Sequence, residues 1–576
     1  MPENRQPGWG AALRGLAVAA TLAGILPGAT AQTAAAQDRP GADARGPGTL
    51  TVVASLSTGW VRNFNPFNET TRLASARDFV FEPLVIFNSM HGGRPHFRLA
   101  TDYDFSDDLQ TLTFTLREDV RWSDGEVFDA DDVVFTFRLL KRNRALDTLD
   151  IWDRVADVQA PDPRTVVFTL KRANANMAFE IVKVPIVPEH VWAKVADPVT
   201  FTNPDPVGTG PMTEVARFTT QVYVQCRNPH YWDAAALDVD CLSFPQLGSN
   251  DQLLTAAAAG KIDWFGAFLP DIERTYVAAD PEHHRYWFPP GGTVALTVNL
   301  DAGADGNRRA FRDVSFRRAV SMAVDRAAIV DIAGYGYPVV NEYASGLGRV
   351  YHDWVNREAE ERFGRFTRFD PGAARSLLAE RGFRDVNGDG FVENPDGSPI
   401  AVTILAPNGW TDWVNTAQLV AESLAAIGID ARVATPEPAA WTQKLIGGDY
   451  DMAINGFFTG ETPHRSFDSA FHSRFAGKTR WASSRFVDPG LDAALDAFTA
   501  TIDPAEQRRI MDTVQMILAA NLPWVPLFSN PVWYEYNTRR FKGWFNADNP
   551  VARPDVFDGT PERLLHLLAL EPARPS

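Results

Sequence analysis

The sequence predicts an α/β protein with mixed sheets and flanking helices, and residues 401–451 carry most of that prediction. Two short apolar runs in this segment, at 401–405 and 429–433, have the length and composition of strands. Between them, apolar residues recur at steps of three and four, the spacing of one helix face: Val414, Ala417, Val420, Ala421, Leu424 and Ile427. Gly428 is suited to end the helix because glycine enters the left-handed conformation at low cost. The segment is therefore a β–α–β unit.

The rest of the chain alternates between strand-like and helix-like patterns. Residues 293–300 alternate strictly, with Val294, Leu296 and Val298 on one face, which is typical of a strand. Further strands are predicted at 50–56, 109–116, 165–170, 221–224, 239–244, 449–458 and 523–536. Helices are predicted at 76–85, 129–140, 251–259, 316–330, 371–381, 504–519 and 561–568.

Length and charge limit the class of protein. The chain has 576 residues, more than one hydrophobic core usually spans, so we expect two or three lobes. The formal net charge of −17 argues against a nucleic acid partner, because a phosphate backbone attracts Lys and Arg. Sixteen Trp residues are many, and large flat rings are a common means of holding sugars, peptides and other amphipathic ligands.

The first 36 residues resemble a signal peptide. Arg5 and Arg14 give a positive start, and an apolar run at 16–25 is too short to span a bilayer as a helix. Two A-x-A cleavage sites follow, at 29–31 and 34–36. The alternative is an uncleaved anchor. No Cys follows the apolar run, which argues against a lipid anchor, so we expect export to a periplasm.

Cys226 and Cys241 are the two cysteines of the chain, and each lies beside a strand-like run. Export places them where disulfides persist, and their number is even, so we expect a disulfide. Two free buried thiols are the alternative.

Several aromatic and polar residues follow strand ends, where ligands bind in open α/β sheets. Trp410, Asp412 and Trp413 follow the first strand of the β–α–β unit, and Trp60 and Asn65 lie in the loop after the first strand of the chain. These positions indicate a ligand site. The alternative is that the rings and amides only pack the core and hold loops.

Residues 385–396 fit the spacing of a calcium loop, with oxygen-bearing side chains at the first, third and fifth positions, Gly at the sixth and a carboxylate at the twelfth. The expected ligands are Asp385, Asn387, Asp389, Glu393 and Asp396. The alternative is a turn held by side-chain-to-backbone hydrogen bonds. Calcium would be structural here, and no other cofactor is expected. The chain has no H-E-x-x-H and no G-x-S-x-G motif, which argues against an exported enzyme.

The chain resembles the solute-binding proteins of ABC importers known as extracellular solute-binding protein family 5. The resemblance spans roughly residues 50–545 and rests on the segments 65–67, 81–84, 116–125, 128–133, 208–211, 227–232 and 313–325. It implies a clamshell of three interlaced domains, a monomer that delivers its ligand to a membrane permease, and no catalytic residues. The implied boundaries are 48–80, 201–299 and 521–576 for domain I, 81–200 for domain II and 300–520 for domain III.

The resemblance leaves two ligand classes open. Peptide-binding members carry an Asp that holds the peptide amino terminus in the segment that here reads 456–463, and Glu461 is the one carboxylate that could replace it. Residues 409–413 are similar to a segment in members that bind β-linked oligosaccharides. The expected stacking residues are Trp60, Trp410, Trp413, Phe457 and Trp533, and the expected polar contacts are Asn65, Asn299, Asp412 and Asn455. An oligopeptide is the first expectation and a β-linked oligosaccharide is the second.

Overall fold

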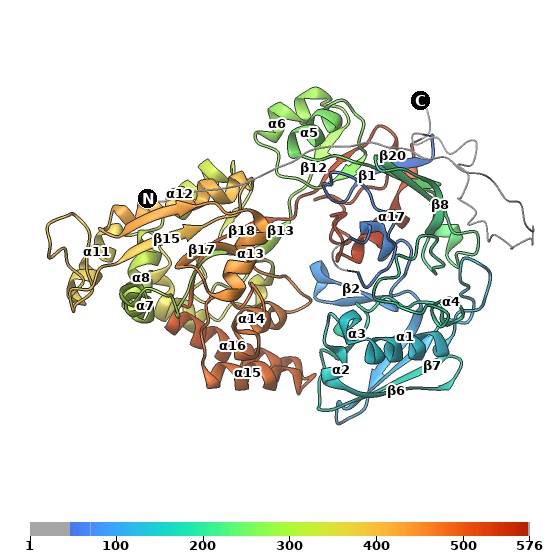
Figure 1. Cartoon of the computed structure of the whole chain (residues 1–576), viewed down its shortest axis with the longest axis horizontal. Helices are drawn as coiled ribbons and strands as arrows, with labels where there is room; N and C mark the ends of the chain where they lie inside the picture. Colours follow the sequence, from blue (N-terminus) through green and yellow to red (C-terminus); the bar gives the residue numbers. More distant parts are fainter. Residues whose placement is uncertain (1–45, 69–70, 574–576) are drawn as a thin grey trace, which may run out of the picture.

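The structure is a computed structural model that describes residues 46–68 and 71–573. It forms two lobes, which we define as the first lobe (46–289 and 532–573) and the second lobe (290–531) (Figure 1). The predicted signal peptide, 1–36, lies outside the described residues. Among the helices of the described segments, none is both long and apolar enough to cross a membrane.

A seven-stranded mixed sheet organises the first lobe. Its strand order is β12 (His284–Tyr286), β19 (Glu535–Asn537), β11 (Trp264–Phe265), β1 (Thr49–Val53), β10 (Cys241–Pro245), β9 (Val222–Arg227) and β8 (Met212–Phe218). The central strand β1 runs parallel to β10 and β11, and its apolar residues Leu50 and Val52 are fully buried. Burial on both faces suits such an apolar central strand.

A four-stranded antiparallel sheet forms the lower part of the first lobe (Figure 1). Its order is β4 (Ala100–Phe105), β5 (Thr111–Leu116), β7 (Thr165–Leu170) and β6 (Val155–Asp162). Helix α1 (Ala130–Arg142) packs against it and begins with a capping box, in which Asp129 and Asp132 each accept a backbone N–H. The smaller elements of this part are β2 (Val85–Asn88), β3 (Arg94–Phe97), α2 (Ile151–Arg154), α3 (Met177–Ile181) and α4 (Glu189–Trp192).

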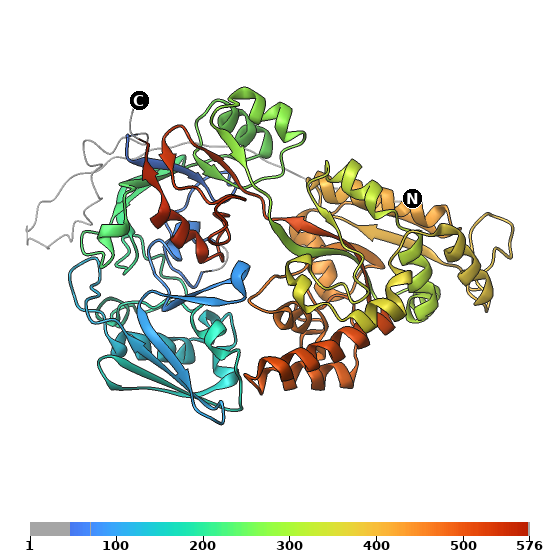
Figure 2. The ribbon, with the colours of Figure 1, turned by 180° about the vertical axis from the view of Figure 1, so that it is seen from behind.

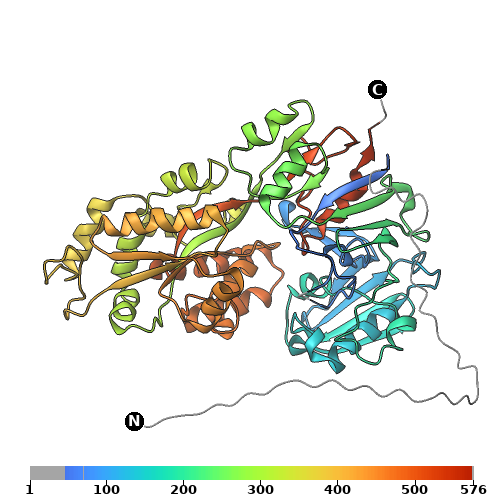
Figure 3. The ribbon, with the colours of Figure 1, turned by 45° about the horizontal axis from the view of Figure 1, so that its top comes forward.

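The second lobe contains a six-stranded sheet with helices on its faces. The strand order is β14 (Val339–Val340), β18 (Trp524–Pro531), β13 (Pro290–Val298), β17 (Met452–Gly456), β15 (Ala401–Leu405) and β16 (Asp430–Ala434). Strands β15, β16 and β17 are parallel, as the β–α–β pattern predicts, and α12 (Thr411–Ala425) lies along this part of the sheet (Figure 3). The other helices around this sheet are α7 (Asp305–Arg312), α8 (Val314–Ala323), α9 (Arg326–Ala328), α11 (Pro371–Glu380) and α13 (Pro438–Gly447).

Three helices at the lower end of the second lobe have a core of their own (Figures 1 and 2). They are α14 (Pro463–Phe471), α15 (Pro489–Thr499) and α16 (Pro504–Asn521), each with Pro in its first turn, where the missing N–H is not needed. The remaining helices and strands are α5 (Asn250–Ala258), α6 (Ile272–Thr275), α10 (Arg357–Phe363), α17 (Glu562–Ala569), β20 (Phe541–Lys542) and β21 (Glu571–Pro572).

The chain passes between the lobes at two neighbouring places, before β13 and after β18, and these strands are antiparallel partners (Figure 2). The predicted boundaries near 300 and 521 assign β13 and β18 to domain I. Both strands are hydrogen-bonded into the six-stranded sheet of the second lobe. The finer division into three domains stays a prediction.

Three predicted elements are wrong. The helix expected at 316–330 is interrupted at Val324, whose extended backbone (φ −82°, ψ 120°) ends α8 and separates it from α9. The helix expected at 76–85 is absent, because Asp78 adopts a left-handed φ of 61° and Pro83 lacks an N–H, and the segment is a turn leading into β2. The strand expected at 523–536 is two strands, β18 and β19, which belong to different sheets. The α/β class with mixed sheets and flanking helices is confirmed.

Candidate ligand-binding site

A cavity of about 440 Å³ lies between the lobes and is lined by both of them. The first lobe contributes residues from the segments 77–89, 149, 182–185 and 553–562, and the second lobe contributes Gly292, the loop 457–461 and Arg465. The loop 457–461 follows directly on β17, so the carboxyl end of a parallel strand leads into the cavity. This is the position at which open α/β sheets bind their ligands.

Two charged residues of the cavity wall are available to a ligand. The side chains of Glu461 and Arg465 take part in no hydrogen bond or ion pair within residues 46–68 and 71–573. The guanidinium of Arg465 lies 5.5 Å from the ring centre of Phe458. A carboxylate and a guanidinium four residues apart in one wall can hold the two ends of a zwitterion.

The other charged groups of the wall have partners in the protein. Nε of Arg563 donates to Asp78 at 2.8 Å, and the carboxylate of Glu562 accepts from the hydroxyl of Ser89 at 2.6 Å. Burial opposes ionisation of Glu180 behind the wall, but Lys183 and Arg465 outweigh burial and bring its pKa down to about 2. These groups therefore shape the cavity and determine its electrostatic potential.

The loop after β17 also joins the lobes. Nη1 of Arg553, in the first lobe, donates to Oγ1 of Thr459 at 3.2 Å. Within the second lobe, the hydroxyl of Tyr351 donates to the carbonyl of Gly460 and accepts from its N–H, at 2.8 and 2.6 Å. The buried Tyr351 thus fixes the loop that faces the ligand.

A second contact between the lobes lies at the end of the three-helix unit. Nδ2 of Asn176 lies 3.1 Å from Nδ1 of His464, and the N–H of Ala175 donates to the carbonyl of Thr499 at 2.6 Å. Nε2 of His464 lies 2.9 Å from the carbonyl of Leu495, so the neutral ring donates there and accepts from Asn176. Burial lowers the pKa of His464, which favours this neutral form.

Trp410, Asp412 and Trp413 lie together, as the sequence predicts, at the start of α12. The Trp410 ring is 42% exposed and its centre lies 5.0 Å from that of Trp413, which is buried. Trp441 lies 6.0 Å from Trp413 and completes a group of three indoles. Burial raises the pKa of Asp412 to about 6.

Three of the predicted polar contacts are fully buried and bonded to the protein: Asn65, Asn299 and Asn455. Asn65 donates to the carbonyls of Pro198 and Phe201, and Asn299 donates to those of Gly448 and Tyr450. Their hydrogen bonds favour a structural role over ligand contact. The sequence cannot distinguish the two roles, because the partners come from distant loops.

The remaining aromatic candidates are dispersed. Phe457 lines the cavity, although its ring packs mainly on Trp524, 4.2 Å away. The indole N–H of Trp60 donates to the carbonyl of Phe244 at 3.1 Å, outside the cavity. Trp533 packs against Phe268 and other rings near the crossing between the lobes. Of these, Phe457 is the ring placed to meet a ligand in this cavity.

The predicted calcium loop is held by its own hydrogen bonds. Its five oxygen-bearing residues are Asp385, Asn387, Asp389, Glu393 and Asp396. The carboxylate of Asp385 accepts from the N–H groups of Gly388 and Gly390, Asn387 donates to Glu393 at 2.7 Å, and Asp396 pairs with Arg309. Among the described residues, no group of three or more His, Cys, Asp or Glu is placed to hold a metal ion. This geometry favours the turn, and calcium binding stays a prediction.

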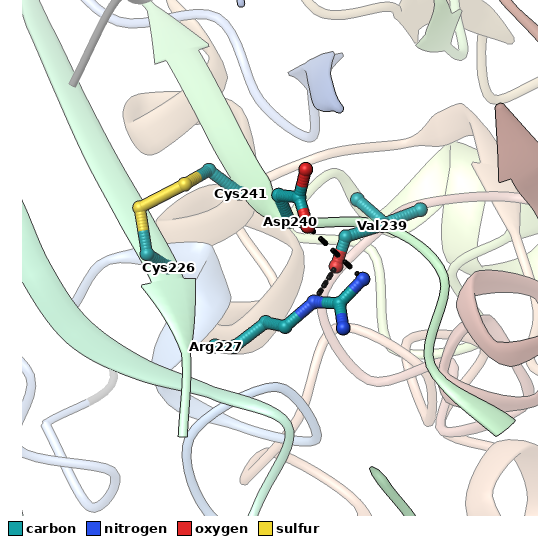
Figure 4. Close-up of a disulfide and its surroundings, with 5 residues drawn as sticks. All are labelled: Cys226, Arg227, Val239, Asp240 and Cys241. Carbon is teal, nitrogen blue, oxygen red and sulfur yellow. Dashed lines mark hydrogen bonds and ion pairs between the residues drawn. A yellow bond between two sulfur atoms is a disulfide. The ribbon is translucent and has the colours of Figure 1, made fainter. Parts of the chain in front are cut away.

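A disulfide joins Cys226 on β9 to Cys241 on β10, directly opposite each other in the strand register (Figure 4). Beside it, Nε of Arg227 donates to the carbonyl of Val239 at 2.9 Å, and its Nη2 lies 3.1 Å from Asp240. The bridge fastens an antiparallel pair in the first-lobe sheet, away from the cavity.

The sequence does not predict Arg465, which lines the cavity. The local signal is that Arg465 follows Glu461 by four residues. This spacing does not reveal the cavity, because the first lobe supplies the opposite wall.

Comparisons with known proteins agree with this architecture. The model of the bacterial extracellular solute-binding proteins, family 5, matches residues 94–478. The chain is 31% identical over 431 residues to Protein XP55 of Streptomyces lividans, covering 72% of each chain. It is 24% identical over 473 residues to the glutathione-binding protein GsiB of Salmonella paratyphi A, covering 80% of this chain and 85% of the relative.

Among solved structures, the chain is similar to a periplasmic oligopeptide-binding protein of an oligopeptide ABC transporter from Thermotoga maritima. The TM-score is 0.84 at 26% identity, covering 92% of this chain and 99% of that one. A mannohexaose-bound structure of the same Thermotoga protein gives a TM-score of 0.78 at 25% identity, covering 92% and 100%.

Proposed function

Because the chain belongs to family 5 of the bacterial extracellular solute-binding proteins, we propose that it captures an oligopeptide or similar extended solute between its lobes. It delivers that solute to the membrane permease of an ABC importer. It acts in a periplasm, as a monomer and without catalysis. A relative that binds glutathione and a structural neighbour named for oligopeptide binding support the peptide class.

The observation that carries the proposal is the pair of charged residues in the cavity wall. Glu461 accepts the amino terminus of a peptide, in place of the Asp that the resemblance to peptide-binding members implies, and Arg465 binds a carboxylate of the same ligand. Neither side chain has a hydrogen-bond or ion-pair partner among residues 46–68 and 71–573. Charge-assisted bonds of this kind fix the orientation of a ligand better than apolar contacts do.

A β-linked oligosaccharide is the second candidate ligand. The exposed ring of Trp410 next to Trp413 and Trp441 favours it, because sugar rings stack on indole faces. The mannohexaose bound to the similar Thermotoga protein favours it as well.

The test is a binding screen that follows intrinsic Trp fluorescence and Tm. The protein is titrated with pools of di- to pentapeptides and, separately, with β-linked oligosaccharides. A ligand that binds only the folded state raises Tm by mass action. A response to peptides that Glu461→Gln abolishes supports the proposal, and a response to sugars alone overturns the peptide assignment.

A matched control separates the loss of the anchor from a general effect of removing one charge. Glu422 is exposed on α12, and its side chain takes part in no hydrogen bond or ion pair among the described residues. Glu422→Gln therefore removes the same charge at a position outside the cavity, and it should leave peptide binding unchanged. Equal losses in the two variants would contradict the role of Glu461.

A further inference from the structure

A half-buried cation lies at the carboxyl end of β17 without a carboxylate partner. Nη1 of Arg480 donates to Oδ1 of Asn455 at 2.6 Å and, at 3.5 Å, reaches the carbonyl of Gly456. No ion pair of the described residues includes Arg480, and its Nε and Nη2 have no acceptor there. Burial alone, with no nearby carboxylate to oppose it, lowers the pKa of Arg480 to about 9.

Indoles frame this guanidinium. Its central carbon lies 3.4 Å from the ring centre of Trp481 and 5.3 Å from that of Trp441. Trp410 and Trp413 pack on Trp441, with ring centres 6.1 and 6.0 Å from it. The buried Nε1–H of Trp441 has no hydrogen-bond acceptor in the described part of the chain.

The frame is continuous with the wall of the cavity. The ring of Phe458, which lines the cavity, lies 4.0 Å from that of Trp481. On the other side, the Trp413 ring lies so close to Gly456 that a Cβ there would come within 3.1 Å of it. The indoles around Arg480 therefore extend the second-lobe wall of the cavity beyond Glu461 and Arg465.

We propose that Arg480, Trp481 and the exposed ring of Trp410, supported from behind by the buried indoles of Trp413 and Trp441, form an anion subsite, which binds a carboxylate attached to a group that stacks on an indole. A charge that is partly shielded from water and has no partner is costly, so a ligand that supplies the carboxylate gains affinity at this position. The planar guanidinium pairs with a carboxylate through two parallel N–H donors. A neutral glucan would need only the indole rings for stacking and would gain nothing from the guanidinium.

The inference rests on the proposed function and narrows its ligand class. The carboxylate has two chemical sources: a uronate residue of an acidic oligosaccharide, or the carboxyl terminus of a peptide that ends in an aromatic residue. Both present an acid next to a flat or stacking group, and the experiment distinguishes them.

The experiment uses matched acid and neutral probes and follows binding by calorimetry. Trigalacturonic acid is compared with its methyl ester, and the tripeptide Gly-Gly-Trp as free acid is compared with its amide. Unaltered protein is measured first, so the comparison stands even if a variant fails to fold. Arg480→Gln then removes the cation, Arg480→Lys keeps a charge without the planar fork, and Arg384→Gln removes an exposed Arg elsewhere as the control.

The subsite predicts that the unaltered protein binds one of the two acids roughly ten- to a hundredfold more tightly than its neutral partner. Arg480→Gln removes that preference, Arg480→Lys retains part of it, and Arg384→Gln leaves it intact. The pair that shows the preference identifies the source. Equal affinity for acid and neutral probes, equal losses for both in Arg480→Gln, or no binding of any of the four probes overturns the subsite.

Failure of the subsite can be told from failure of the proposed function. A peptide or oligosaccharide from the broader pools that binds without any acid preference refutes the role of Arg480 and leaves solute capture standing. No response to any pool refutes both.

Discussion

Arg553 spans the two lobes: its Nη1 donates to Thr459 at 3.2 Å, while its Nε donates to Asp555 at 2.6 Å. Asp555 is fully buried in the first lobe and holds the guanidinium whether or not the second lobe is near. The bond to Thr459 therefore exists only when the lobes touch. A bond of this kind stabilises the arrangement in which a ligand is enclosed, and it adds nothing to the separate lobes.

Thr459→Val should weaken ligand binding about two- to tenfold, because a typical net hydrogen bond contributes about 0.5–1.5 kcal/mol. The change keeps the shape of the side chain and removes the acceptor. Thr169→Val, at an exposed strand position outside the cavity, is the matched control and should leave affinity unchanged. Calorimetry with a ligand from the peptide screen measures both. An unchanged Kd in Thr459→Val would show that the cross-lobe bond does not contribute.

Replacing both cysteines by serine should lower the free energy of unfolding by roughly 3 kcal/mol, because the bridge closes a short loop in the unfolded chain. The half-cystines are 15 residues apart, and neither lines the cavity. Urea unfolding measures the loss, and ligand affinity should stay unchanged. Reductant should destabilise the natural protein and leave the double variant unaffected. A variant of undiminished stability would show that the strand pairing alone fixes β9 and β10.

Glu535 predicts a specific pH dependence of stability. Its carboxyl group is fully buried, accepts from the N–H of Ala267 at 3.1 Å and has no cationic partner among the described residues. Burial raises its pKa well above the usual 4.5, so the folded state keeps the proton that the unfolded chain loses. Its contribution to stability is full below 4.5 and falls as the pH rises toward the folded pKa, by about 1.4 kcal/mol per pH unit.

Glu535→Gln should remove this pH dependence, because the amide reproduces the neutral acid. The variant should match the natural protein near pH 4 and exceed it in Tm by a margin that grows as the pH rises. Thermal unfolding across a pH series measures the difference. Parallel curves for the two proteins would contradict the assignment of a protonated Glu535.

Sequence patterns predict local units such as a β–α–β segment well, but they do not predict which distant segments come into contact. The β–α–β unit at 401–451 follows from short-range spacing, and the structure places its two strands side by side in the same sheet. Glu461 was identified through the resemblance to family 5, as the one carboxylate that could replace the Asp of peptide-binding members. Arg480 was not, because the contact of its side chain with Asn455 depends on how the chain returns to the end of β17 after 25 residues.

The asparagines show that a local pattern can also predict a ligand contact where the structure has a buried, hydrogen-bonded side chain. Asn65 and Asn299 follow strands, as ligand-binding amides do, yet each is fully buried and donates to two carbonyls of the protein. A local pattern gives the position of a polar side chain along the chain. Its partner is decided by loops that lie more than a hundred residues away, so a structural amide and a ligand-binding amide have the same signature.

Gly292 lies near the crossing between the lobes and packs against the loop 457–461. A substitution at Gly292 tests whether this packing positions the loop for the ligand. A Cβ at this position would lie 2.1 Å from the carbonyl oxygen of Phe457, a backbone atom that cannot rotate away. Gly292→Ala should therefore displace the loop 457–461, lower stability by about 1–3 kcal/mol and weaken ligand binding. At Gly303 an added Cβ has no heavy atom within 4 Å, so Gly303→Ala is the matched control. Calorimetry and urea unfolding of both variants measure the effect. If Gly292→Ala bound ligand like the control, the packing of β13 against the loop after β17 would not position the site.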